Sequence, residues 1–430
     1  MEINRLYKIF LNCSKVITDS RSAEHNSLFF ALKGENFDGN KYANKALEKG
    51  CSYAVVDNPD FVLNDKFILV NNVLEALQQL GNYHRKQLNI PIIAITGTNG
   101  KTTTKELVAA VLTEKYNVSY TQGNFNNHIG VPLTLLEMNQ DTEIGVVEMG
   151  ANHIGEIEKL CEIAEPDLGI ITNIGKAHLE GFGSFENIIK AKSELYEYIQ
   201  SKNGMVFYNS NNSILQDLNK KLKINSVIFG NITFTVHSTI LPTDVFLSLK
   251  INIGNYNTIL KTQLIGDYNQ ENIEAAASIG YHYEIEPEII VSSIENYIPT
   301  NNRSQFLKTE NNRLFLDAYN ANPTSVEASV RNFMSLKIEN KYIILGDMLE
   351  LGAESKVEHK RIVELLVSLS VEKVLLVGRI YSSLEINQSY LQFQDVNDLQ
   401  DWLSINKITD SNILIKGSRG IKLEKLIGLL

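Results

Sequence analysis

The sequence predicts a three-domain α/β protein built mainly on parallel sheets. Its 430 residues are enough for about three domains at roughly 150 residues each. Runs of β-branched residues are followed by polar loops and then by helical patterns, as at residues 92–112 and 342–369. Such alternation indicates parallel strands joined by helical crossovers. The alternating apolar and polar residues at 245–253 indicate added antiparallel strands.

Composition restricts the classes of function. With 43% hydrophobic and 21% charged residues, the chain belongs among globular proteins. Its formal net charge of -10 gives no electrostatic support for nucleic-acid binding. The three cysteines, Cys13, Cys51 and Cys161, lack the spacing of a zinc site or a disulfide framework. No secretory leader or membrane-length apolar run is found, so we expect a cytoplasmic protein without membrane insertion.

Residues 1–88 are expected to form a small α/β domain. Strand-like segments at 27–32 and 54–56 flank a helical segment at 42–49. Ser20 and Arg21 precede the first of these strands in a polar turn. On residue type alone, a solvated surface turn is the favoured interpretation, since most polar loop residues are simply hydrated.

Residues 89–300 are expected to form a central P-loop ATPase-like domain, because residues 92–104 read as a buried strand, a glycine loop and a helix start. The two loop glycines let the backbone curl around an anion, whose charge Lys101 would neutralise. The Thr102 hydroxyl could reach a bound Mg²⁺. The usual pattern has a further glycine where this chain has Ile95, so an ordinary turn with a solvated lysine is the competing interpretation.

Polar residues follow two further strands of this domain. Glu148 ends the strand within 143–152, and His178 follows the strand at 168–172. Because ligands gather at the carboxyl ends of parallel strands, Glu148 is placed to hold Mg²⁺, with His178 at the same sheet edge. The amide-rich loop at 124–130 is either a hydrogen-bonded turn or a donor of amides to ligand oxygens.

A lysine is expected on the apolar side of a helix that Ser184 begins. Lys192 falls four residues after Ile188 and therefore on the same face. A lysine directed inward needs an anion or must lose its charge.

Residues 301–430 are expected to form a C-terminal Rossmann-like open sheet, because strands at 314–316, 342–345, 374–377 and 413–415 are separated by helical stretches. Polar loops follow three of these strands, at residues 317–323, 346–352 and 416–420.

Together these motifs resemble the Mur ligases, ATP-dependent amide-forming enzymes of peptidoglycan precursor synthesis. The family-wide signals are the loops at 97–103 and 124–130 and the residues Glu148, His178, Lys192 and Asn272. The segments 317–323 and 346–352 resemble the member that adds D-alanyl-D-alanine, while 19–21 and 29–39 resemble the family's uridine-nucleotide domain. One departure is Asn302, where a glycine normally precedes Arg303.

The resemblance implies ADP-forming ligation of D-alanyl-D-alanine to UDP-N-acetylmuramoyl-tripeptide through an acyl phosphate. It implies ATP and two Mg²⁺ ions, with Lys192 carbamylated, and Lys101, His178 and Lys192 as catalytic residues. The implied metal ligands are Thr102, Glu148, His178 and Lys192. The implied ATP-binding residues are Gly97, Thr98, Asn99, Gly100, Lys101, Thr102, Thr103, Asn272, Arg303 and Asp317. The implied substrate-binding residues are Ser20 and Arg21 at the uridine end, Asn126 and Asn127 at the UDP-sugar, and Asn320 and Asn322 on the dipeptide side.

Three alternatives remain open. The diaminopimelate- or lysine-adding relative is the nearest, but its Asp-Asn-Pro-Arg motif is absent from the last domain, and residues 57–60 match it only in part and in the wrong domain. A P-loop kinase or NTPase shares the phosphate loop but needs no amine. A nucleotide-binding module without catalysis would not need two metal sites. We expect a monomer that binds small-molecule substrates and no nucleic acid.

Overall fold

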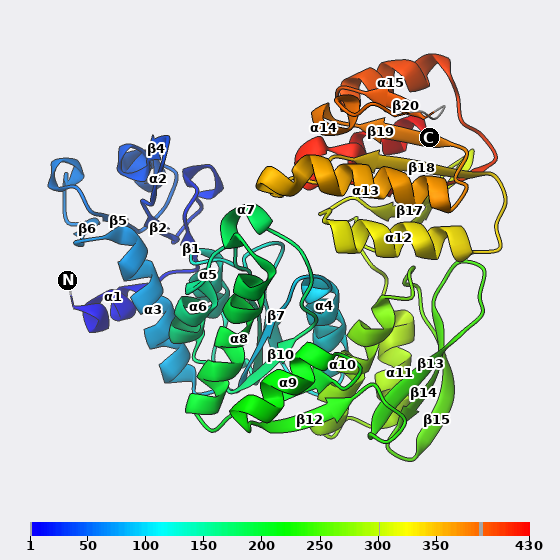
Figure 1. Ribbon diagram of the computed structural model, residues 1–430. Helices are drawn as coiled ribbons and strands as arrows, with labels where there is room; N and C mark the ends of the chain where they lie inside the picture. Colours follow the sequence, from blue (N-terminus) through cyan, green and yellow to red (C-terminus); the bar gives the residue numbers. More distant parts are fainter. Residues whose placement is uncertain (1, 301, 387–389) are drawn as a thin grey trace.

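The computed structural model describes residues 2–300, 302–386 and 390–430 (Figure 1). Three α/β regions follow one another along the chain, which confirms the three-domain α/β prediction and the mostly parallel sheets. The boundaries 1–88, 89–300 and 301–430 stay a prediction, and residues 1 and 301 lie outside the described part. Among the described residues, no helix combines the length and apolar character needed to cross a membrane.

The N-terminal region contains a four-stranded parallel sheet in the order β1-β2-β5-β6. Its elements are α1 (Ile3–Phe10), β1 (Val16–Ile17), η1 (Ser20–Ser22), β2 (Leu28–Phe30), β3 (Lys33–Gly34), β4 (Phe37–Asp38), η2 (Gly39–Tyr42), α2 (Ala43–Glu48), β5 (Tyr53–Val56), η3 (Pro59–Phe61), β6 (Phe67–Leu69) and α3 (Val73–Leu88). Helix α3 begins at the Asn72 cap and packs on α5 (Gly130–Glu137) of the next region, where Leu133 and Leu136 join the same apolar core.

The central region combines a six-stranded parallel sheet, in the order β12-β11-β10-β7-β9-β8, with the antiparallel sheet β13-β14-β15. Its elements are β7 (Ile92–Thr96), α4 (Lys101–Leu112), β8 (Val118–Tyr120), α5 (Gly130–Glu137), β9 (Ile144–Glu148), α6 (Glu156–Ala164), β10 (Leu168–Ile171), α7 (Leu179–Phe182), α8 (Phe185–Ser201), β11 (Met205–Asn209), α9 (Ser213–Leu222), β12 (Asn225–Phe229), β13 (Val236–Leu241), β14 (Ser248–Ile253), β15 (Tyr256–Lys261), α10 (Asn269–His282) and α11 (Pro287–Asn296).

Strand β7 is buried on both faces of the central sheet. Ile93 and Ile95 pack in one apolar cluster, whereas Ile92 and Ala94 pack in the cluster on the opposite face. This alternation is the two-residue period of a strand covered by helices on both sides. Because β7 lies between β9 and β10, the loops that follow these three strands open at one sheet edge, where ligands of such sheets bind.

The C-terminal region is a six-stranded sheet in the order β16-β17-β21-β18-β19-β20, parallel except for β16. Its elements are β16 (Gln305–Lys308), β17 (Asn312–Asp317), α12 (Pro323–Ser335), β18 (Lys341–Gly346), η4 (Gly352–Glu354), α13 (Ser355–Ser368), β19 (Val374–Val377), α14 (Arg379–Ser382), β20 (Leu391–Phe393), α15 (Val396–Ile405), β21 (Ser411–Lys416), η5 (Arg419–Ile421) and η6 (Leu423–Leu429).

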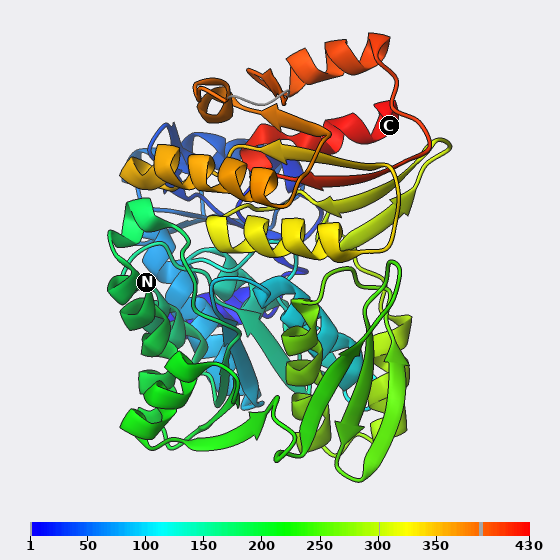
Figure 2. The same ribbon diagram turned by 45° about the vertical axis from the view of Figure 1, so that its right-hand side comes forward.

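The C-terminal region lies over the carboxyl edge of the central sheet, with α12 on its underside in both views (Figures 1 and 2). Asn322, the cap of α12, reaches the loop that precedes α4, and α7 contacts η4. The loops expected to bind nucleotide are therefore covered by the last region of the chain.

Candidate functional site

A cavity of about 1130 Å³ lies where the three regions meet. The N-terminal region lines it with Glu75 and Gln78 of α3, the central region with its strand-end loops, and the C-terminal region with Arg303 and Asp317. Lys101, Glu148 and His178 line the same cavity, so the structure brings these three predicted residues together.

The loop between β7 and α4 is a cradle that only glycine allows at two positions. Gly97 and Gly100 have φ values of +143° and +80°. A Cβ atom on either would collide, with Thr172 at the first and Asn272 at the second. The Lys101 ammonium donates to the Gly97 and Thr98 carbonyls at 2.7 and 3.0 Å. The predicted strand, loop and helix start are thus all present.

Glu148 is a buried carboxylate beside this cradle, only 1% exposed. Its Oε2 accepts from the Thr102 hydroxyl at 2.8 Å, and its Oε1 accepts from Asn126 Nδ2 at 2.8 Å. Both donors are neutral, and the charge of Glu148 acts on the nearby Lys101, whose pKa it raises against the larger lowering effect of burial. The carboxylate and the threonine hydroxyl are the hard oxygen ligands that Mg²⁺ prefers.

Lys192 lies on the buried face of α8, as predicted, and is 3% exposed. Ser184 caps this helix by accepting from the Asn187 backbone amide. The pKa of Lys192 is lowered to about 7, mainly by burial and next by the positive charge of Lys101, while Glu194 and Glu156 partly offset these two effects. A lysine of this kind is largely neutral just above neutral pH and can act as a nucleophile toward CO₂.

His178 occupies the first position before α7, in the left-handed conformation with φ +50°. Its Nδ1 lies against Oε2 of Glu350, which belongs to the C-terminal region. The His178 ring holds the pKa of Glu350 below its usual value. Among the described residues, no group of three or more His, Cys, Asp and Glu is gathered for a metal ion.

A chain of amides connects the cradle to the C-terminal region. Asn272 accepts from the Thr104 hydroxyl at 3.0 Å and donates to Asn269 Oδ1 at 2.8 Å. Asn269 in turn donates to the hydroxyl of Ser304, the residue that follows Arg303, at 3.0 Å. The preceding Asn302 has φ +55°, a left-handed conformation that explains why a glycine suits this position.

The C-terminal side of the cavity carries positive charge. The Arg303 guanidinium stacks on the Tyr319 ring at 3.6 Å, and Arg419 lies 5.3 Å from the same ring. Lys416, which is 1% exposed, donates to Asp317 Oδ2 at 2.6 Å. Burial is the largest cause that lowers the pKa of Lys101, and the positive charge of Arg303 lowers it further. The two cations are therefore close enough to repel each other.

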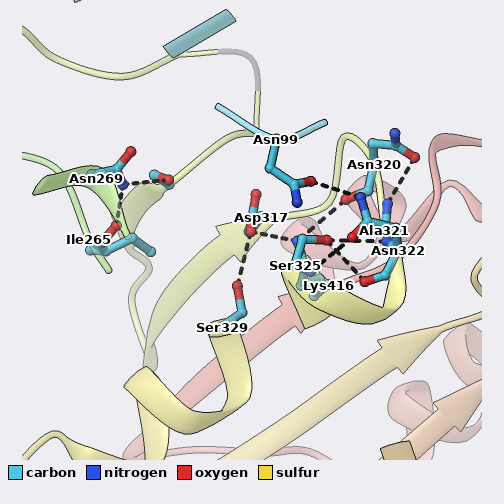
Figure 3. Close-up of polar contacts among 11 residues, drawn as sticks. Asn99, Ile265, Asn269, Asp317, Asn320, Ala321, Asn322, Ser325, Ser329 and Lys416 are labelled. Carbon is cyan, nitrogen blue, oxygen red and sulfur yellow. Dashed lines mark hydrogen bonds and ion pairs between the residues drawn. The ribbon is translucent and has the colours of Figure 1, made fainter. Parts of the chain in front are cut away.

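The predicted substrate residues have defined partners. Asn127 Oδ1 accepts from the backbone amides of Ile129 and Gly130, at the start of α5. Asn320 Oδ1 accepts from the Ala321 amide. Asn322 caps α12 by accepting from the Ser325 amide and also donates to Asn99 (Figure 3).

The uridine-end residues lie apart from this group. Ser20 and Arg21 sit in η1, where Arg21 pairs with Asp19 at 2.7 Å, and neither lines the cavity.

Lys416, Tyr319 and Glu350 are site residues to which sequence reasoning gave no role, although the loops that contain them were recognised. Lys416 stands directly opposite Asp317 in the pairing of β21 with β17. The sequence places opposite charges at the ends of these two strands. It does not show that the strands pair, because they are distant in sequence.

Three family models match the chain: the Mur ligase family catalytic domain at residues 13–96, the Mur ligase middle domain at 95–280, and the Mur ligase glutamate ligase domain at 302–419. A curated relative from Bacillus subtilis (strain 168) is 34% identical over 426 residues, covering 96% of this chain and 92% of its own length. One from Escherichia coli (strain K12) is 31% identical, with coverages of 96% and 93%. Both are named UDP-N-acetylmuramoyl-tripeptide--D-alanyl-D-alanine ligase.

Solved structures with the same fold include a crystal structure of MurF from Acinetobacter baumannii. It has a TM-score of 0.87 and 29% sequence identity, and the match covers 99% of this chain and 97% of that one. The MurF ligase of Thermotoga maritima, in complex with ADP, has a TM-score of 0.85 at 24% identity, and its likeness concerns the fold.

Proposed function

The chain belongs to the Mur ligase family, and from this premise we propose that it joins D-alanyl-D-alanine to UDP-N-acetylmuramoyl-tripeptide with conversion of ATP to ADP and phosphate. The product is the pentapeptide precursor of peptidoglycan. The observation that carries the proposal is the meeting of Lys101, Glu148 and Arg303 in one cavity to which all three regions contribute.

The chemistry requires two anions to approach each other. The terminal carboxylate of the tripeptide attacks the γ-phosphorus, ADP leaves, and an acyl phosphate forms. The dipeptide amine then attacks the acyl carbon, and after proton loss the tetrahedral intermediate expels phosphate. Lys101 and Arg303 supply the positive charge that lets carboxylate and triphosphate share the site. Gly97 to Thr103 and Asn272 bind the ATP, and Asp317 lies at the same cavity wall.

The side chains at this edge fit a divalent cation. Thr102 and Glu148 present two hard oxygen donors, and Glu148 is a buried carboxylate whose two hydrogen-bond donors are neutral. We assign them to one Mg²⁺ and His178 with Lys192 to a second. A Mg²⁺ ion held by these residues would neutralise phosphate charge and help to orient the γ-phosphate. The neutral amine favoured by burial of Lys192 can form a carbamate, which would make it an anionic ligand.

The remaining assignments extend the same arrangement. Asn126 and Asn127 face the cavity and are assigned to the UDP-sugar, while Ser20 and Arg21 are assigned to the uridine end. Asn320 and Asn322 are assigned to the dipeptide side. Closure of the C-terminal region over the cavity keeps water from the acyl phosphate. A cytoplasmic location and a monomeric state stay predictions.

The proposal is tested by offering the purified full-length chain ATP and Mg²⁺ with paired acceptors and amines, and by measuring ADP release together with product mass. UDP-N-acetylmuramoyl-tripeptides that end in diaminopimelate or in lysine are both supplied. We expect a product only when a tripeptide and D-alanyl-D-alanine are both present. If the chain instead adds diaminopimelate or lysine to UDP-N-acetylmuramoyl-dipeptide, the proposal is overturned. ADP release without any amine would also overturn it.

A further inference from the structure

The contact between His178 and Glu350 joins two regions of the chain at the edge of the cavity. His178 follows β10 of the central sheet, whereas Glu350 follows β18 of the C-terminal sheet. Nδ1 of His178 is enclosed and lies against Oε2 of Glu350, and the His178 side chain as a whole is 22% exposed. Nε2 is therefore the ring nitrogen that Glu350 does not hold.

Further contacts dock the same two segments on each other. The Glu180 amide donates to the Glu350 carbonyl at 3.3 Å, and Lys176 pairs with Glu358 at 3.7 Å. A Cβ atom on Gly352 would lie 3.3 Å from the Glu180 backbone, so there is little free space between the segments. The His178–Glu350 pair thus belongs to an interface with several points of contact, and it lies at the margin of that interface, because the Glu350 side chain is 55% exposed.

Both residues of the pair have unusual backbone conformations. Glu350 has φ +66° and His178 has φ +50°, and neither is a glycine. Such left-handed conformations cost free energy and persist where the surrounding structure holds them. The side chains of these two residues meet across the interface.

We propose that Glu350 is a positioning residue for His178, holding its ring across the interface so that Nε2 is oriented for a metal ion only while the C-terminal region is docked. A histidine that ligates a metal usually donates its other N–H to a carboxylate, which sets its tautomer and orientation. The carboxylate here comes from a different region than the histidine. This inference rests on the proposed function, which assigns His178 to a metal ion.

One consequence is that metal binding and docking stabilise each other. If the metal prefers the oriented imidazole, then metal binding favours the docked arrangement by the same factor by which docking favours the metal. Removing the Glu350 carboxylate should weaken metal binding and docking of the C-terminal region together, and it should leave the phosphate cradle and Glu148 unchanged.

The test uses the full-length chain saturated with the ATP analogue β,γ-methylene-ATP and titrated with Mn²⁺, followed by electron paramagnetic resonance. Small-angle X-ray scattering of the same samples reports docking. We expect Glu350→Gln to weaken the Mn²⁺ site by about tenfold and to increase the radius of gyration at intermediate Mn²⁺. Glu364→Gln, an exposed acid on α13, is the matched control and should behave as the wild type.

The same titration separates this inference from the function beneath it. If His178→Ala weakens Mn²⁺ binding while Glu350→Gln binds Mn²⁺ and docks as the wild type does, then Glu350 has no positioning role and the metal assignment survives. If His178→Ala also binds Mn²⁺ normally, then the metal assignment fails and the inference fails with it. A wild type that forms no product would instead contradict the proposed function.

Discussion

Asn322 Nδ2 donates to Asn99 Oδ1 at 2.7 Å, so the residue that caps a C-terminal helix also touches the phosphate cradle (Figure 3). The same side chain accepts from the Ser325 backbone amide at 2.9 Å through its Oδ1 atom. One amide group therefore serves two purposes with its two ends. The oxygen starts α12, and the nitrogen joins α12 to the loop expected to hold the triphosphate.

These two purposes can be separated by substitution. Asn322→Ala should destabilise the chain by about 1 kcal/mol, because it removes the helix cap, and should speed hydrogen exchange in the first turn of α12. Asn322→Asp keeps an oxygen to cap the helix but loses the nitrogen that reaches Asn99. Its first-turn exchange should stay close to that of the wild type. Equal exchange rates in the two variants would mean that the cap contributes nothing measurable.

Glu148 should set the metal requirement of the reaction. Replacing it with Gln keeps the shape but removes the charge, and it should reduce turnover by at least about 10- to 100-fold and raise the Mg²⁺ concentration needed for half-maximal rate. Initial rates over a Mg²⁺ series measure both effects. Glu143→Gln, just before the amino end of the same strand, is the control and should keep the wild-type Mg²⁺ dependence. An unchanged dependence in Glu148→Gln would remove this residue from the metal site.

The buried Lys192 should lower the free energy of unfolding at neutral pH. The same lowered pKa gives the neutral amine that can react with CO₂. The pKa of its amine is about 7 in the folded chain against an ordinary 10.5. Between these values the unfolded chain binds the proton and the folded chain does not, so this group makes stability rise with pH across that window. In buffers free of CO₂, Lys192→Met should be about 1–2 kcal/mol more stable than the wild type near pH 7. The difference should shrink toward pH 10, as urea unfolding at several pH values will measure. A constant difference would contradict the lowered pKa.

The chemical role of Lys192 has its own test. Lys192→Ala should lose nearly all turnover, and short-chain carboxylic acids should restore part of it by placing a carboxylate where the carbamate would lie. The activity of the alanine variant is measured against acid concentration, with the wild type as the control for inhibition by the same acids. Full activity of the variant without any added acid would exclude the carbamate assignment.

Local features of the site could be predicted because their causes lie within a few residues. The strand, glycines and helix around Lys101 follow from backbone requirements within residues 92–112. The Ser184 cap and the inward direction of Lys192 follow from helical spacing within α8. Glu148 was placed correctly because the end of a buried parallel strand is itself a local pattern.

Other features depend on which distant segments become neighbours. Nothing near Glu350 indicates that it meets His178, since the contact exists only after two separate sheets have formed and docked. The same holds for Asp317 and Lys416, whose strands are among the first and the last of the C-terminal sheet. The short edge strand β8 has only partly buried residues, so its sequence lacks the strong apolar pattern that would predict a strand.

The buried ion pair of Lys416 with Asp317 allows a final prediction. Lys416→Met leaves the Asp317 carboxylate, whose side chain is only 15% exposed, without its cation. Removing one partner of a buried pair costs about 3–5 kcal/mol, whereas removing both costs much less. The double variant Asp317→Asn with Lys416→Met should therefore be more stable than Lys416→Met alone, with a coupling of at least about 1 kcal/mol. Calorimetric unfolding of the wild type, the two single variants and the double variant measures this coupling. If the two single losses simply add in the double variant, the pair is not a coupled unit, and the charge of Asp317 must be compensated by other groups at the cavity wall.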